Sequence, residues 1–243
     1  MVKGELLFLS DCHLDARRPQ MIEMLAGFLR ERAAAAARVY ILGDLFEAWL
    51  GDDDDSTDYD DVIDALSDLR TSAELYFMAG NRDFLVGEDF ARRVGLTLLS
   101  EPCSIQLGDS HVVLVHGDSL CTDDHDYQAF RSMVRNPAWQ TEFLAKPLSE
   151  RQQIAAELRR NSAAAMRQKT SDIMDVNETT VAELFDQSQA DIIVHGHTHR
   201  PAVHQYPAGR QRLVLGDWVE APSYLSWSES RGFELIDPRV VDA

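Results

Sequence analysis

Five short apolar runs recur along the chain, and each is followed by polar residues of the same few kinds. The runs cover residues 6–9, 39–42, 75–78, 112–115 and 192–194. Continuous apolar runs of this length are typical of strands buried on both faces of a parallel sheet. Asp, Asn or His follows each run, and open α/β sheets bind ligands beyond the carboxyl ends of their strands. The pattern predicts one polar site where the five strand ends meet.

Helical periods separate the first three runs. Strands are predicted over 5–10, 39–42 and 75–78, with helices over 20–37, 59–70 and 88–94. This βαβαβ order predicts parallel strands with right-handed crossovers. Further along, the pattern predicts a hairpin of 104–107 with 111–115, a helix over 178–187 and a strand over 191–194. Three last strands, expected to be antiparallel, cover 212–215, 224–227 and 232–236.

Residues 125–170 differ from the rest because helical periods dominate there, interrupted by Asn136-Pro137 and Lys146-Pro147. The segment lies between two strands that both end in candidate ligands, so we expect a helical insertion placed over the site. It is also basic: from residue 131 to 170 there are eight Lys and Arg against three Glu, in a chain of net charge −18. A local basic segment suggests an anionic ligand or an anionic membrane surface, and a solvated helix face is the alternative.

Composition narrows the classes of function. The net charge of −18 argues against nucleic acid as a partner, because phosphate backbones bind basic surfaces. No apolar run approaches 18 residues, and the first residues lack the apolar core of a signal peptide, so we expect neither a membrane span nor export. The three cysteines are unpatterned and are expected to be reduced thiols of a cytoplasmic protein. No obligate protein partner is expected.

The polar residues after the runs have the chemistry of metal ligands. The candidates are Asp11, His13, Asp44, Asn81, His116, His197 and His199. Carboxylate, imidazole and amide groups together suit Mn, Fe, Zn or Mg. Seven ligands exceed the need of one ion, whereas one bridging carboxylate would give each of two ions about four, an arrangement that clamps the oxygens of a phosphoryl transfer. The alternative is that these are ordinary turn residues. That explanation suits any one of the five polar sequences taken alone, but not all five together.

These residues carry a resemblance. The order Asp-x-His, Gly-Asp, Gly-Asn-x-Asp, His and Gly-His-x-His resembles that of the calcineurin-like metallophosphoesterases. Longer strings, at 43–53, 80–85, 116–124 with 127–131, and 197–201, resemble the UDP-2,3-diacylglucosamine pyrophosphatases of the lipid A pathway, over about residues 7–218. The resemblance implies an α/β fold, an αββα sandwich of two mixed β-sheets flanked by helices. It implies a single domain over 1–243, with 125–170 a helical lid over a hydrophobic chamber for two acyl chains.

The resemblance also implies the roles of individual residues. Asp11, His13, Asp44 and His199 would hold one Mn²⁺, and Asp44, Asn81, His116 and His197 the second. Asn81, Arg82, Asp124, Ser162, Lys169 and His197 would bind the substrate, with Met166 standing where the family has an Asn. The implied reaction is hydrolysis of UDP-2,3-diacylglucosamine to UMP and 2,3-diacylglucosamine 1-phosphate. Metal-activated water would attack the uridine-side phosphorus, in a protein peripheral to the cytoplasmic side of the inner membrane.

Arg82 distinguishes among reactions of this class. Arginine cannot act as a general acid at neutral pH, because its pKa exceeds about 12. A phosphate-monoester leaving group, with a second pKa of about 6, departs without a proton, so Arg82 fits pyrophosphate cleavage and would hold phosphate oxygens. The alternative is a structural arginine paired with Asp83. Among neighbours, Asp118 is expected to orient His116, His195 to pack or support the ligands, and Asp217 to form a turn.

Two other functions stay open at this point. A soluble nucleotide pyrophosphatase or phosphodiesterase would use the same ligand set on a substrate without acyl chains. A catalytically silent metal-binding scaffold would keep the ligands and lack turnover.

Overall fold

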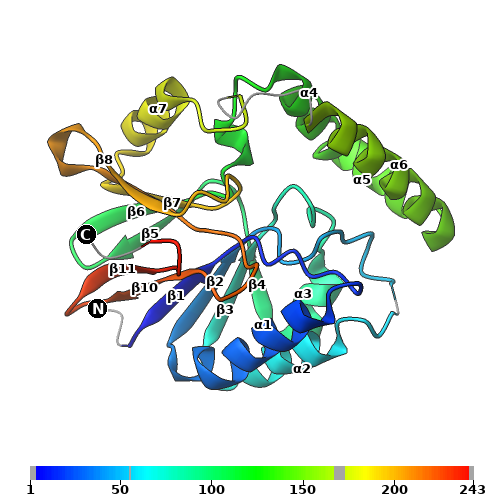
Figure 1. Cartoon of the computed structure of the whole chain (residues 1–243), viewed down its shortest axis with the longest axis horizontal. Coiled ribbons are helices and arrows are strands. Elements are labelled where there is room, and N and C mark those ends of the chain that lie inside the picture. The colour runs from blue at the N-terminus through cyan, green and yellow to red at the C-terminus, as the bar shows by residue number, and fades with distance from the viewer. Residues whose placement is uncertain (1–3, 55, 167–172, 241–243) are drawn as a thin grey trace.

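The computed structural model describes residues 4–54, 56–166 and 173–240, and it describes side chains in those ranges outside 161–166. Two β-sheets lie face to face with helices on both outer sides, which gives four layers (Figure 1). The αββα sandwich expected from the resemblance is therefore confirmed.

The first sheet has six strands in the order β11-β10-β1-β2-β3-β4. Their bounds are Leu6–Leu9 (β1), Arg38–Leu42 (β2), Glu74–Met78 (β3), Leu96–Leu99 (β4), Tyr224–Ser228 (β10) and Gly232–Ile236 (β11). Strands β1 to β4 are parallel, as the βαβαβ pattern predicts, whereas β10 and β11 are antiparallel to their neighbours.

The second sheet has five strands in the order β5-β6-β7-β9-β8. Their bounds are Cys103–Leu107 (β5), Ser110–Leu114 (β6), Ile192–His195 (β7), Ala202–Gln205 (β8) and Gln211–Val214 (β9). The predicted hairpin of β5 with β6 is confirmed, and β6, β7 and β9 run parallel.

The strand residues are apolar without interruption because both faces of the inner strands are covered. In β1, Leu6 and Phe8 point between the sheets, where Phe8 stacks on Tyr40 with ring centroids 4.9 Å apart. Leu7 and Leu9 point the other way, into the layer of helices. A strand buried on both faces loses the alternation of apolar and polar residues.

Helices cover the two outer faces. Helices α1 (Pro19–Glu31), α2 (Asp60–Leu69) and α3 (Glu88–Val94) pack on the first sheet. Helix α7 (Glu178–Ser188) packs on the second sheet through Val181 and Phe185.

Three more helices lie between β6 and β7 in the sequence and extend beyond the sandwich (Figure 1). They are α4 (His125–Val134), α5 (Pro137–Leu144) and α6 (Leu148–Met166), and we call residues 125–166 the helical arm. Within 125–160 only Val134, Phe143 and Arg151 are fully buried. Arg151 donates to the backbone carbonyl of Leu50 and pairs with Asp53, so part of the arm's positive charge anchors it to the sandwich.

Several predicted elements were wrong or missing. The helix expected over 20–37 ends at Glu31, and a short 3₁₀ turn (Ala33–Ala35) follows, because the chain must turn there to enter β2. β4 and β8 were not predicted. Both are edge strands, and β8 is too exposed to show an apolar pattern. β9 was expected to be antiparallel, but it pairs parallel with β7 and antiparallel only with β8.

None of the helices in the described part of the chain has the length and apolarity needed to cross a bilayer.

Candidate active site

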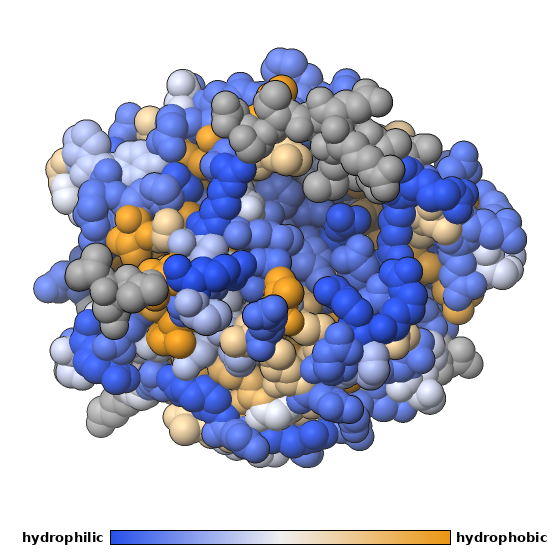
Figure 2. Space-filling model, in the orientation of Figure 1, coloured by the Kyte–Doolittle hydropathy of each residue, from blue (hydrophilic) through white to orange (hydrophobic). Residues whose placement is uncertain are grey.

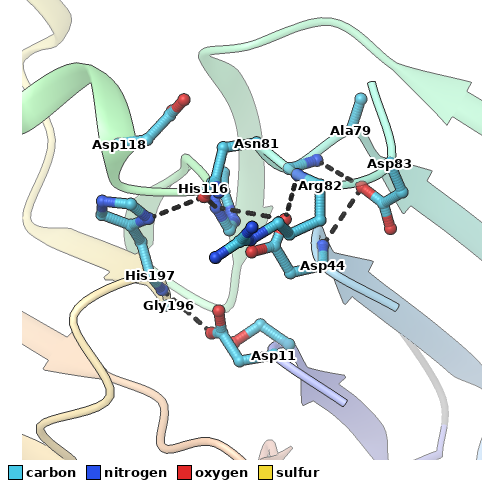
Figure 3. A network of polar contacts seen from close by, with 12 residues as sticks. Asp11, Asp44, Ala79, Asn81, Arg82, Asp83, His116, Asp118, Gly196 and His197 are labelled. Atoms are coloured by element: carbon cyan, nitrogen blue, oxygen red, sulfur yellow. Dashed lines mark hydrogen bonds and ion pairs between the residues drawn. The ribbon is translucent and has the colours of Figure 1, made fainter. Parts of the chain in front are cut away.

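The five strand ends meet at one edge of the sandwich. Asp11, Asp44 and Asn81 follow β1, β2 and β3, while His116 follows β6 and His197 follows β7 (Figure 3). The structure brings all seven candidate ligands together, as two groups of three side chains with Asp44 between them. On the face seen in Figure 2, hydrophilic residues line a hollow beside the helical arm.

The first group consists of Asp11, His13 and His199. The Nε2 atom of His199 lies 3.2 Å from Asp11 Oδ1 and 3.2 Å from His13 Nε2. His13 Nε2 is also 3.7 Å from Asp11 Oδ1. These ligand atoms lie within 4.8 Å of one another, close enough to share an ion.

The second group consists of Asn81, His116 and His197. The Asn81 Oδ1 atom lies 3.0 Å from His116 Nε2 and 2.9 Å from His197 Nδ1 (Figure 3). Asp44 stands between the groups: its Oδ2 atom is 3.7 Å from His13 Nε2, and its Oδ1 atom is 3.7 Å from His116 Nε2. One carboxylate therefore presents one oxygen to each group.

Most of these ligands have an unusual backbone. Among the described residues, seven other than glycine have positive φ, and five of them are candidate ligands: Asp11, His13, Asp44, His197 and His199, with φ between 46° and 66°. This left-handed conformation is uncommon outside glycine and costs about 1–3 kcal/mol at each residue, although Asp and His tolerate it better than most. Strained backbone conformations cluster at functional sites, and they could not be predicted from the sequence pattern.

One glycine is required by a close approach. Gly43, immediately before Asp44, has a φ of +89°, and a Cβ atom there would lie 2.5 Å from His116 Nδ1 and 2.6 Å from the Cα of Gly80. A side chain at this position would push apart the loops after β2, β3 and β6. The Gly-Asp pair of the sequence thus keeps Asp44 close to both groups.

The charges and unpaired atoms of the site fit a cation. Asp11 Oδ1 is buried without a hydrogen-bond partner, while Asp11 Oδ2 accepts from Ser10 and from the backbone N–H of His197. Burial by itself raises the pKa of Asp11, but the nearby His199, whose Nε2 atom is 3.2 Å from Asp11 Oδ1, and the charges of His116 and His13 hold it below its ordinary value. A buried carboxylate oxygen aimed at imidazoles is the donor set that a divalent ion uses.

The histidines differ in their titration. Burial opposes protonation of His116, but Asp44, Asp118 and Asp11 outweigh it and raise its pKa to about 9. Burial, followed by repulsion from His116, lowers the pKa of His197 to about 4. The carboxylates around His116 create a field that favours a positive charge at the second group.

Asp83 fixes the loops that carry the ligands. Its carboxylate accepts hydrogen bonds from the backbone N–H groups of Gly80, Asp44 and Leu45, at 2.8, 3.2 and 2.7 Å. Burial and the neighbouring Asp44 raise the pKa of Asp83 to about 6. The alternative in which Arg82 pairs with Asp83 is therefore wrong. The charged partner of Arg82 is Glu47, whose Oε1 atom is 3.7 Å from Arg82 NH1.

The expectation for Asp118 was also wrong. His116 Nδ1 donates to the backbone carbonyl of Leu42 at 2.8 Å, so a carbonyl rather than Asp118 sets the ring orientation. Asp118 instead accepts from Tyr127 and Arg131 on α4.

His195 has a packing role, as expected. It is fully buried, and its Nε2 atom accepts from Arg212 at 3.1 Å. Burial, followed by the charge of Arg212, lowers the pKa of His195 to about 3. Asp217 does not form the expected turn; its Oδ2 atom lies 3.5 Å from His199 Nδ1 instead.

Glu47 is a site residue that the sequence analysis missed. Its Oε2 atom lies 3.1 Å from His13 Nδ1, and its backbone carbonyl accepts from Arg159 of α6 at 3.1 Å. Glu47 belongs to the long string at 43–53, but nothing in its spacing separates it from a solvated residue.

The expected substrate residues are only partly described. Asp124 begins α4, where its side chain accepts from the backbone N–H of Tyr127 at 3.1 Å. Ser162 and Met166 lie on α6, and their side chains are outside the description. Lys169 lies outside the described residues.

Comparison with known proteins identifies the class. A family model for calcineurin-like phosphoesterases matches residues 5–201, so the chain belongs to this family of hydrolases. The UDP-2,3-diacylglucosamine hydrolase of Stenotrophomonas maltophilia (strain K279a) is 48% identical over 230 residues, covering 90% of this chain and 93% of that protein. The protein of the same name from Marinobacter nauticus is 44% identical over 240 residues, covering 97% and 98%. Within the phosphoesterases, the chain belongs with these relatives, as the long strings indicated.

Replacing Asp83 by Ala should lower the free energy of unfolding of the metal-free protein by at least about 2 kcal/mol, because buried backbone donors lose their acceptor. Urea unfolding followed by circular dichroism measures the change. The control is Asp89→Ala on α3, where the carboxylate is exposed and the expected change is within about 0.5 kcal/mol. Equal effects of the two substitutions would contradict the role given to Asp83.

Proposed function

We propose that this chain hydrolyses the pyrophosphate bond of UDP-2,3-diacylglucosamine, giving UMP and 2,3-diacylglucosamine 1-phosphate. The observation that carries the proposal is the Asp44 carboxylate, with one oxygen facing each group of ligand atoms. Two ions about 3.5–4 Å apart would clamp the attacking and leaving oxygens of an in-line phosphoryl displacement. The assignment of the substrate rests on the relatives, which are 44–48% identical to this chain and are named for this sugar nucleotide.

The proposed cofactor is two Mn²⁺ ions per chain. Asp11, His13, Asp44 and His199 would hold one ion, and Asp44, Asn81, His116 and His197 the other. Bound at this site, the ions supply an activated water and neutralise charge on the phosphoryl oxygens. The residues of the chain hold that arrangement: Asp44 accepts from the backbone N–H of Arg82 at 2.8 Å, which aims its carboxylate between the groups.

Arg82 is proposed to hold the phosphate that becomes the leaving group. Its side chain is 28% exposed and lies beside Asn81 and Asp44, so it can reach a substrate in front of the ligand groups. The leaving group needs no proton at neutral pH, which suits a guanidinium that cannot donate one.

A product assay tests the reaction. The acylated UDP-sugar, incubated with Mn²⁺ in ¹⁸O-labelled water, should give UMP that carries the label, because the proposed attack is on the uridine-side phosphorus. Chelator should abolish turnover and added Mn²⁺ should restore it. Label in the sugar phosphate would overturn the choice of phosphorus. Absence of turnover with metal bound would favour a silent scaffold.

Asp44→Ala should lose both Mn²⁺ ions and nearly all turnover, because this carboxylate is the one shared by the two groups. Metal analysis of purified protein and the product assay measure the two effects. A variant that keeps two ions per chain would exclude a bridging role for Asp44.

Arg82→Ala should reduce kcat by at least about tenfold while leaving the melting temperature and the metal content near those of the wild type. The reason is that Arg82 is 28% exposed beside the ligand groups and its ion pair with Glu47 is long, at 3.7 Å, so its loss should cost little stability. A large fall in melting temperature, with normal activity per folded molecule, would reverse the assignment.

We further propose that 125–170 is a lid within a single domain spanning 1–243. It would cover the acylated sugar and help to hold the protein at the cytoplasmic surface of the inner membrane. Met133 and Leu144 of the helical arm are 45% and 40% exposed, which gives the arm apolar surface for lipid. Two neighbouring arginines of α6 differ: Arg159 donates to the backbone carbonyl of Glu47, whereas Arg160 is exposed and could meet lipid head groups.

Arg160→Gln should weaken binding to anionic vesicles by up to about fivefold, since one cation near the surface contributes about 1 kcal/mol. The matched control is Arg92→Gln on α3, and added salt should reduce the difference between the variants. Removing the acyl chains from the substrate should lower kcat/KM by at least about 100-fold, because each buried CH₂ contributes about 0.8 kcal/mol. Comparable cleavage of UDP-glucose would favour a soluble nucleotide pyrophosphatase.

A further inference from the structure

Helix α4 is attached to the sandwich in an unusual way. Of its ten residues only Val134 is fully buried, so apolar packing contributes little to its position. Three long side chains are spaced four residues apart: Tyr127 and Arg131 on α4, and Arg135, which caps the end of the helix, so they lie on one face. Together they contact the loops that carry all three ligands of the second group.

Arg131 reaches His116 through one carboxylate. Its NH2 group donates to Glu101 Oε2 at 2.7 Å, and Glu101 Oε1 accepts from the backbone N–H of His116 at 2.8 Å. The Nε atom of Arg131 donates to Asp118 Oδ2 at 2.9 Å. Asp118 is fully buried and begins the turn that follows His116. One guanidinium thus binds both Glu101, which holds the backbone N–H of His116, and Asp118, which follows His116 in the same loop.

Arg135 reaches the loop that carries Asn81. Its NH2 group donates to the backbone carbonyls of Ala79 and Gly80, at 3.1 and 2.9 Å. Gly80 directly precedes Asn81, so this guanidinium fixes the backbone immediately before the ligand.

Tyr127 reaches His197. Its ring is stacked on the His197 ring at an interplanar angle of 28°, with centroids 6.0 Å apart, and its hydroxyl donates to Asp118 Oδ2 at 2.6 Å. Asp118 lies beside His116 and His197 (Figure 3). The hydroxyl contact prevents the Tyr127 ring from turning away from the histidine.

We propose that α4 is a positioning element for the second ligand group, in which Tyr127, Arg131 and Arg135 fix the orientation of His197, His116 and Asn81. None of the three touches the reacting atoms, and the first group has no such contacts from α4 among the described residues. This inference rests on the proposed metal centre and adds that the arm forms part of that centre.

The test measures Mn²⁺ binding to the metal-free full-length protein by titration calorimetry, in variants Arg131→Met and Arg135→Met. Residues that orient metal ligands typically change affinity by about 10- to 100-fold. We expect that loss for one of the two Mn²⁺ ions and no change for the other. Asn81→Ala, which removes a ligand of the second group, shows which ion is affected. Arg92→Met, an exposed arginine on α3, is the matched control and should bind as the wild type does.

Kinetics give a second readout. In the Arg131 variant kcat should fall at limiting Mn²⁺ and recover at high Mn²⁺, while KM stays within about twofold. Arg131→Lys, which reaches only one of its two carboxylates, should give an intermediate loss. Tyr127→Phe keeps the ring and removes only the hydroxyl contact, so it tests the proposal even where an arginine variant folds poorly.

Two results would overturn the inference while leaving the proposed function intact. One is unchanged affinity for both ions in all the variants. The other is an equal weakening of both ions together with a lower melting temperature, which would make α4 a support for the fold only. A wild-type protein that binds a single Mn²⁺ ion would overturn both this inference and the dinuclear centre.

Discussion

The placement of one buried carboxylate determines the rest of the site. Asp44 lies between the two ligand groups. Its position depends on Gly43, on the backbone N–H of Arg82, which donates to its carboxylate, and on Asp83, which accepts from the backbone N–H of Asp44. A carboxylate can occupy such a place only where the surrounding polar groups compensate for its burial. The convergence of β1, β2, β3, β6 and β7 supplies those groups, because the end of each strand contributes a short polar loop.

The sequence was sufficient to predict which residues gather and at which edge of the sheets. Apolar runs that end in Asp, Asn or His have a direct physical meaning, since the carboxyl ends of parallel strands meet. The αββα sandwich followed from the resemblance, and the first sheet's parallel strands followed from the alternation of strands and helices. The prediction missed two edge strands, β4 and β8. The residues of β8 are mostly exposed, so its sequence shows no apolar run.

Features that arise from tertiary contacts were not predictable. The left-handed backbone at Asp11 or His13 has no local sequence signature, and the contact of Glu47 with His13 depends on how two loops meet. The expectation for Asp118 failed for a similar reason. The His116 ring donates to the carbonyl of Leu42, the last residue of β2, and not to Asp118, two positions along the chain, and only the fold brings Leu42 to that ring.

The sandwich and the helical arm differ in how they resist opening. Hydrophobic clusters fill the layers of the sandwich, whereas the described arm residues 125–160 bury only Val134, Phe143 and Arg151. Segments with few buried apolar contacts open locally at a lower free energy than global unfolding. Amide hydrogens of α4 and α6 should therefore exchange with solvent before those of β1 and β7, so local opening of the arm need not unfold the sandwich.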